Sequence, residues 1–183
     1  MNFDNHDYCI VRWADFDRLY QENFEFLHLF EMQHSRKFLE LHAPVYSRLV
    51  RQFYANLTYI DDVHQTMVND QHFTVTPLDF HQIAGLQAEG SFIGDPSDPW
   101  WKCNTDNVYT ACLRENAKWE GRCKRAGSMK VEARLILYLL SYCLIPRSTG
   151  NHAQPTELDL KYINGLKLAI LMNWSKVNDA LSG

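Results

Sequence analysis

The sequence predicts a mainly α-helical fold of the α+β class. We expect a single domain over residues 1–183, with a helical bundle-like core and one small β-hairpin. Three observations predict this. Apolar residues recur at three- and four-residue steps over most of the 183 residues. Residues 59–76 change to a short-period, β-branched pattern around turn residues. No repeat, low-complexity tract or linker divides the chain, and 46% apolar content is enough for one core.

The first part of the chain predicts two helices. Residues 14–42 carry apolar side chains at helical spacing, and Pro44 must end or bend that helix because proline lacks an amide donor. A second helix is expected from Val45 to about Asn56. Its apolar stripe consists of Leu49, Val50, Phe53, Tyr54 and Leu57.

The predicted hairpin follows this second helix. Two strands, 63–68 and 72–76, flank the turn residues Asn69-Asp70-Gln71. Thr76 then has the character of a helix N-cap, with Pro77 in the first helical position and Asp79 near the positive end of the helix dipole. Gly85 is expected to end this short helix.

The second part of the chain predicts three further helices and a short terminal one. A loop over 87–104 precedes a helix over 106–119. The most apolar helix, 131–144, is expected at the centre of the core and ends before Pro146. After a polar loop, a helix is predicted over 156–171. Asn173 would cap a last short helix that begins at Trp174.

Composition and short motifs exclude several classes of protein. The five cysteines (Cys9, Cys103, Cys112, Cys123 and Cys143) form no C-x-x-C pair, which favours free thiols in a reducing compartment. We expect no metal and no cofactor. No long apolar run spans a membrane, and the N-terminus lacks the features of a secretory signal. The expected location is therefore intracellular, cytoplasmic or nuclear.

Two adjacent tryptophans, Trp100 and Trp101, lie in the predicted 87–104 loop. A tryptophan pair in a loop either covers the core or forms a contact surface for a partner. Trp100 and Trp101 are therefore our candidate partner-binding residues, although covering the core is the simpler interpretation.

The charge is distributed unevenly along the chain. Residues 1–100 carry a net charge of −9 and residues 101–183 a net charge of +5. The positive charge centres on the 114–134 region. Such a cluster neutralises phosphates or forms a solvated surface. The candidate nucleic-acid-binding residues are Arg114, Lys118, Trp119, Arg122, Lys124, Arg125 and Lys130.

Signatures of catalysis are missing from the sequence. It contains no Gly-x-Ser-x-Gly elbow and no glycine-rich phosphate loop. An enzyme site assembled only by the fold remains an alternative. His64 and His72, which would face each other across the hairpin, and Cys112 are the residues we would expect in it.

Several segments resemble one protein family. Leu49-Val50-Arg51-Gln52-Phe53-Tyr54-Ala55-Asn56-Leu57 resembles the LVREFYANL core of the plant transposon protein domain. Residues 73–86, 117–119, 134–138 and 173–174 also resemble it, so the likeness covers roughly residues 30–180. The sequence departs from the family pattern at Val68-Asn69-Asp70-Gln71, where a basic residue is lost. The resemblance implies a retroelement-derived, mainly helical plant domain and brings no catalytic residues with it.

The sequence thus favours a non-enzymatic domain that works by protein–protein interaction or self-association. The first alternative is a nucleic-acid-binding module that uses the basic 114–134 region. The second is an enzyme with a site formed only in the folded chain. No membrane partner is expected.

Overall fold

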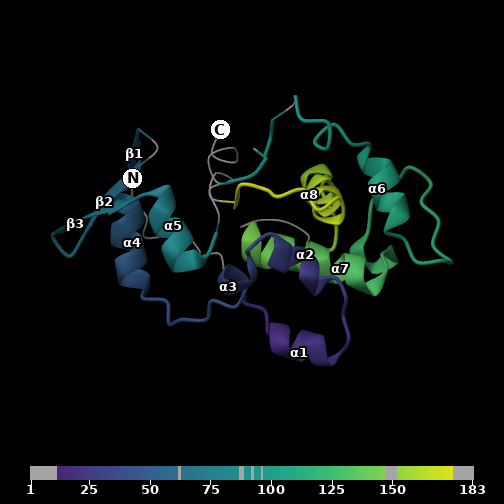
Figure 1. Ribbon diagram of the computed structural model, residues 1–183, viewed down its shortest axis with the longest axis horizontal. Coiled ribbons are helices and arrows are strands. Elements are labelled where there is room, and N and C mark those ends of the chain that lie inside the picture. Colours follow the sequence, from purple (N-terminus) through teal and green to yellow (C-terminus); the bar gives the residue numbers. More distant parts are fainter. Residues whose placement is uncertain are drawn as a thin grey trace.

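The fold is mainly α-helical with a small antiparallel sheet, as the sequence predicts (Figure 1). A computed structural model describes residues 12–61, 63–86, 89–91, 93–95, 97–146 and 152–174. The elements fall into two regions. A helical core lies on the right of Figure 1, and a smaller lobe, residues 45–84, lies on the left.

The prediction of one continuous helix over residues 14–42 is wrong, because three short helices take its place. These are α1 (Phe16–Gln21), α2 (Leu27–Met32) and α3 (Arg36–Leu39). Asn23 and His34 have φ angles of 59° and 53°, in the left-handed region, and such residues end a helix. The apolar periodicity continues across these breaks, so the spacing of apolar residues does not predict them.

Helices α6 (Thr105–Ala111), α7 (Val131–Leu139) and α8 (Glu157–Lys167) form the centre of the core. The predicted 131–144 helix is confirmed, since α7 continues through a π turn at Leu140–Leu144. The predicted 106–119 helix is too long, because α6 ends at Ala111. The predicted 156–171 helix is also too long: α8 ends at Lys167, and Ala169 has a φ of 54°. The predicted short helix from Trp174 lies largely outside the described residues.

One buried polar side chain ties the ends of the core together. Gln33 is 1% exposed, and its Nε2 donates to the carbonyl of Ile170 at 2.7 Å. Its Oε1 accepts from the Met172 amide at 3.0 Å and from Trp174 Nε1 at 3.1 Å. Because buried polar groups must be paired, this one side chain fixes the segment after α8 against α2.

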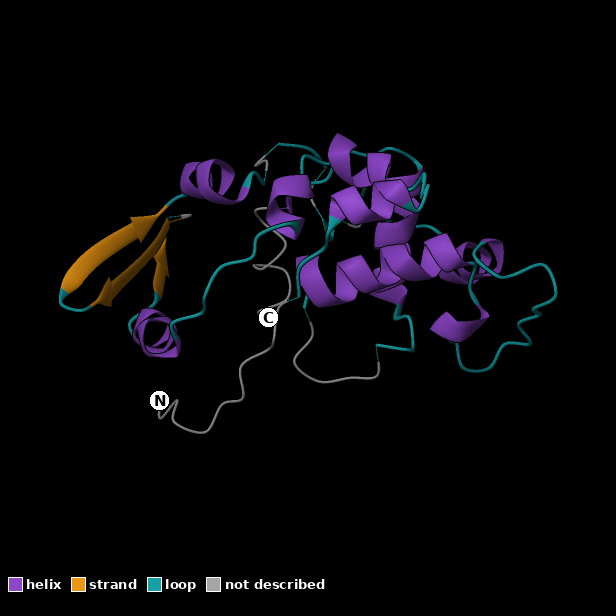
Figure 2. Ribbon diagram, turned by 90° about the horizontal axis from the view of Figure 1, so that it is seen from below, coloured by secondary structure: helices purple, strands orange, loops and turns teal. Residues whose placement is uncertain are grey.

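The lobe contains α4 (Ser47–Ala55), β1 (Thr58–Ile60), β2 (Val63–Val68), β3 (Gln71–Val75) and α5 (Pro77–Ala84). The sheet order is β1-β2-β3, so the sheet has three strands where the sequence predicted a two-stranded hairpin. Asn69 and Asp70 both have left-handed φ angles, 50° and 60°, as a tight two-residue hairpin turn requires. Figure 2 shows the strands at the end of the lobe furthest from the core helices.

Polar contacts hold α4 on the sheet. Thr66 is buried, and its hydroxyl donates to the Phe53 carbonyl at 2.6 Å. Asn56 Nδ2 donates to the Met67 carbonyl at 2.9 Å. At the other end of the lobe, the predicted N-cap of α5 at Thr76 is confirmed, and Thr76 and Asp79 form a capping box in which each side chain accepts from the other's backbone amide. Gly85, with a φ of 75°, ends α5 as predicted.

Lys37 connects the lobe to the core. Its Nζ donates to the Gln82 carbonyl at 2.7 Å, and its side-chain carbons lie against Gly85. Ala84, the last residue of the lobe, and Leu86, two residues beyond it, are buried in the core cluster. The lobe is therefore anchored where α5 meets the core, while its strands project away from it.

Candidate interaction surfaces

The two predicted partner-binding tryptophans lie against α8. Trp100 is 6% exposed, and a Cβ built on Gly165 would come within 2.9 Å of its ring. Trp101 is half-buried, with its ring 6.0 Å from that of Tyr162 and the Lys161 ammonium 4.7 Å from its centroid. The structure thus corrects Trp100 as a partner anchor: its side chain fills the core where Gly165 leaves room. Trp101 is accessible only in part.

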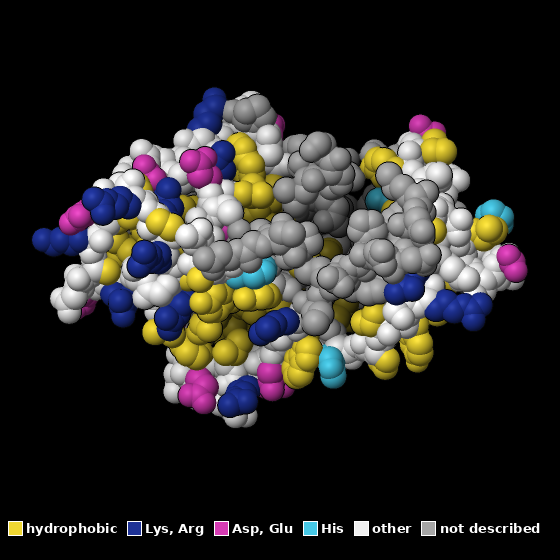
Figure 3. Space-filling model, turned by 180° about the vertical axis from the view of Figure 1, so that it is seen from behind, with side chains coloured by type: hydrophobic (Ala, Val, Ile, Leu, Met, Phe, Trp, Pro, Cys, Tyr) yellow, Lys and Arg dark blue, Asp and Glu magenta, His cyan; other side chains and the backbone are white. Residues whose placement is uncertain are grey.

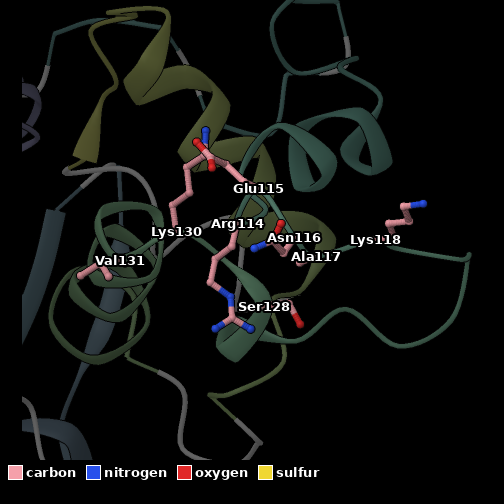
Figure 4. A pocket seen from close by; sticks show the side chains of 8 residues that line it. All are labelled: Arg114, Glu115, Asn116, Ala117, Lys118, Ser128, Lys130 and Val131. Carbon is pink, nitrogen blue, oxygen red and sulfur yellow. The ribbon is translucent and has the colours of Figure 1, made fainter.

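The basic candidates gather on an irregular segment after α6, residues 112–130, which we call the basic segment. Arg114, Lys118 and Lys130 are exposed and line an open hollow of about 800 Å³ together with Glu115 and Ser128. In Figure 4 these side chains do not converge: Arg114 points toward Ser128, while Lys118 points away on the other side. Such an arrangement is not a pocket for a single anion.

Two of the predicted nucleic-acid-binding residues are engaged within the protein. Lys124 Nζ pairs with the Asp106 carboxylate at 2.8 Å and lies 5.0 Å from the centre of the Trp119 ring. The Trp119 indole N–H donates to the Arg122 carbonyl at 2.8 Å, and its ring packs edge-on against Tyr109. Trp119 is therefore half-buried, and its N–H is used within the protein. Arg122 and Arg125 are exposed.

The structure does not bring together the three residues expected for a fold-assembled enzyme site. His64 is paired with Val75 and His72 with Met67, so the two imidazoles lie on opposite faces of the sheet. The expectation that they face each other is wrong because the turn contains two residues, which shifts the register. Cys112 is fully buried in the core, where Lys167 Nζ donates to its Sγ at 3.2 Å.

Within the described residues, no group of three or more His, Cys, Asp or Glu side chains is arranged to hold a metal ion. None of the described helices has the length and apolarity needed to cross a bilayer. Cys103, Cys112, Cys123 and Cys143 are free thiols, and Cys9 lies outside the described residues.

The lobe exposes most of the large apolar side chains found on the described surface. Helix α4 buries none of its nine residues. Tyr46, just before α4, is 67% exposed, and Leu78 and Ile83 on α5 are 62% and 67% exposed. Large exposed apolar side chains in this region are Val45, Tyr46, Leu49, Tyr54, Tyr59, Ile60, Phe73, Leu78 and Ile83. A monomeric surface rarely exposes so many in one region.

Strand β3 forms an open edge of the lobe. It pairs with β2 on one side, and no described strand pairs with its other side. Four of its five residues are exposed, and its sequence, Gln-His-Phe-Thr-Val, contains no proline, lysine or acidic residue. Natural edge strands are normally protected by such residues, so β3 is an unprotected template for another strand.

The sequence showed the apolar stripe of α4 but not that it would lie outside the core. A stripe of this kind has the same spacing whether it is buried or exposed. The edge position of β3 also has no local signal, because it depends on which strands pair. The absence of charged residues in 71–75 is the one feature of the sequence that pointed to it.

The chain matches no known protein-family profile, no curated protein and no solved structure. The resemblance to the plant transposon protein domain therefore stays a prediction.

Proposed function

We propose that this protein is a non-enzymatic interaction domain that associates with a second copy of itself through the open edge of β3. A helical, bundle-like core would present the lobe, and two three-stranded sheets would join into one of six strands. The observation that carries this proposal is an exposed, unprotected edge strand in the region with most of the exposed apolar side chains.

Antiparallel pairing about a two-fold axis at Phe73 fits the sequence of the strand. Gln71 would lie opposite Val75 of the second copy, and His72 opposite Thr74. The two Phe73 rings, each 48% exposed, would meet on the face of the sheet that carries Thr66, which is directly opposite Phe73 in the register. Directly opposed aromatic residues are favourable cross-strand pairs. This contact is self-complementary, as two-fold symmetry demands.

Charge does not oppose this register. Asp70, the turn residue just before β3, would lie opposite Thr76 of the second copy, so no two carboxylates meet. The other edge strand, β1, is a poorer candidate because it has only three residues and leads directly into Asp61. Short strands are one of the ways in which proteins avoid edge pairing.

A charge exchange at Phe73 tests the proposal. Phe73→Lys and Phe73→Glu each place two like charges opposite each other across the axis, so each variant alone should be monomeric in sedimentation velocity. Mixed in equal amounts, they should form a heterodimer, because lysine then faces glutamate. Restoration in the mixture also shows that both variants are folded.

Leu168→Lys is the matched control, because Leu168 lies at the end of α8, outside the lobe, and its apolar side chain is 56% exposed. That variant should self-associate like the unchanged protein. A protein that is monomeric at all concentrations, or single variants that still dimerise, would contradict the proposal. So would Phe73→Lys and Phe73→Glu if their mixture stayed monomeric.

Nucleic-acid binding is the second candidate, because Arg114, Lys118, Arg122, Arg125 and Lys130 are all exposed on the basic segment. Their diverging side chains suit an extended phosphate backbone better than a single anion. An electrophoretic mobility shift with single-stranded nucleic acid at low salt should disappear in Arg114→Gln plus Lys118→Gln. No shift with the unchanged protein at low salt would exclude this function.

The proposed plant retroelement origin is a separate prediction that rests on the sequence resemblance. It is compatible with a self-associating domain and names no partner.

A further inference from the structure

A second hollow, of about 360 Å³, opens between α1 and α7. It shares no lining residue with the hollow of the basic segment. Its walls are apolar and aromatic, formed mainly by Leu19, Phe26, Leu135, Tyr138 and Leu139. Figure 3 shows hydrophobic side chains gathered over α1 and α7 in the lower left of that view. A volume of this size lies within the range of small-molecule pockets.

The π turn shapes one wall of this α1–α7 hollow. The Ile145 amide donates to the Leu140 carbonyl at 2.7 Å, which inserts one residue more than an α-helical turn holds. The wider turn brings Tyr142 and Cys143 into the lining. The Tyr142 ring lies 5.9 Å from that of Tyr138, nearly edge to face. π turns within helices occur frequently at functional sites.

Arg12 supplies the one formal charge among the nine lining residues. Its backbone amide donates to the Tyr142 carbonyl at 3.3 Å, and its guanidinium lies 4.8 Å from the centre of the Tyr142 ring. No carboxylate within the described part of the chain pairs with this guanidinium. The stacking on Tyr142 holds this cation in place at the apolar hollow.

Cys143, which also lines the hollow, adds no charge. Burial raises the pKa of its thiol to about 11, although the nearby Arg12 charge acts in the opposite direction. The thiol is therefore neutral at pH 7, and the hollow combines aromatic walls with a single positive charge.

We propose that the α1–α7 hollow binds a small organic anion with an aromatic body, such as an aromatic carboxylate. The Tyr138 ring and the aliphatic side chains would contact the body. The Tyr142 ring, which stacks on His152 with centroids 4.0 Å apart, would hold the planar Arg12 guanidinium where it pairs with the carboxylate. This proposal is independent of self-association, because the hollow lies in the core and contains no residue of the lobe.

Two fluorescent probes test it directly. 1-Anilinonaphthalene-8-sulfonate carries an aromatic body with an anionic group, and N-phenyl-1-naphthylamine is the same body without the charge. The unchanged protein should bind the sulfonate more tightly than the neutral probe. Arg12→Met should weaken sulfonate binding roughly tenfold, as expected for one charge-assisted contact, and leave the neutral probe unchanged.

Arg18→Met, on α1 but outside the lining, removes the same charge and should change neither affinity. Leu139→Trp narrows the hollow and should weaken the binding of both probes. An unchanged melting temperature of Arg12→Met shows that this variant is folded and that its loss of binding has another cause. 1-Naphthoate should displace the sulfonate, whereas 1-naphthalenemethanol should not. Equal affinity for the two probes, or an Arg12→Met variant that binds the sulfonate normally, would overturn the proposal.

Discussion

Helices α4 and α8 have similar lengths, nine and eleven residues, but opposite environments. Helix α8 buries six of its residues, including Leu160, Ile163 and Leu166. Helix α4 buries none, although its apolar side chains also lie on one face. The same sequence pattern therefore serves the core in one region and the surface in the other. The difference shows that amphipathicity predicts a helix but not what covers it.

The two regions also differ in what holds them together. The core is held by buried apolar side chains from distant parts of the chain, with Gln33 as a polar tie. The lobe relies more on hydrogen bonds between side chains and backbone, such as those of Thr66 and Asn56. We therefore expect substitutions in the core to lower the free energy of unfolding more than substitutions in the lobe.

The largest difference should appear when the same change is made in both regions. Leu160→Ala removes a fully buried side chain of α8 and should lower the free energy of unfolding by about 4 kcal/mol. Leu49→Ala in α4, where the side chain is 37% exposed, should lower it by less than about 1 kcal/mol. Urea denaturation of both variants measures this, and equal losses would show that α4 is packed as tightly as α8.

Removing the polar tie of the core should rank second. Gln33→Leu leaves the Ile170 carbonyl, the Met172 amide and the Trp174 indole N–H without their partner, and should cost about 3 kcal/mol. Its counterpart in the lobe is Gln52→Leu, which removes a single exposed acceptor of the Asn69 amide. That change should cost less than about 1 kcal/mol. If Gln33→Leu and Gln52→Leu lowered the free energy of unfolding equally, Gln33 would not be the tie that we describe.

A smaller effect is expected within the lobe. Thr66→Val keeps the shape of a buried side chain but removes its hydrogen bond to the Phe53 carbonyl, which should cost about 1 kcal/mol. Thr58→Val removes an exposed hydroxyl from the same sheet and should have little effect on stability. Amide hydrogen exchange of α4 should increase in the first variant only.

The smallest effect concerns the cap of α5. The Thr76 hydroxyl and backbone amide donate to the Asp79 carboxylate and lower the pKa of Asp79 below its usual 3.8. Because the pKa is lower in the folded state, this contribution to stability is complete above pH 3.8 and is lost as the pH falls through the folded-state pKa. An NMR titration should show this lowered pKa, and Asp79→Asn should remove this contribution to the pH dependence of stability. A pKa at or above 3.8 would contradict the cap.

Local signals in the sequence predicted much of the fold. The N-cap at Thr76, the stop at Gly85 and the Asn69-Asp70 turn all act within a few residues, and all are present. The helix breaks at Asn23 and His34 were missed because the apolar spacing runs through them. The third strand was missed because β1 has only three residues, and short strands carry little periodicity.

The candidate surfaces were harder to predict because they depend on contacts between distant segments. Trp100 is accommodated in the core by Gly165, which lies 65 positions further along the chain. Lys124 and Trp119 lie in the basic 114–134 region of the sequence, but their contacts with Asp106 and Arg122 form only in the folded loop. The α1–α7 hollow combines Arg12 with residues of α7, and no sequence motif joins them.

Amide hydrogen exchange at increasing protein concentration tests the central claim most directly. If β3 accepts a second copy, the amides of residues 71–75 that point away from β2 should become protected as the concentration rises. The amides of α8 should exchange at the same rates throughout. Exchange in β3 that is independent of concentration would contradict the proposal that this strand is where two copies meet.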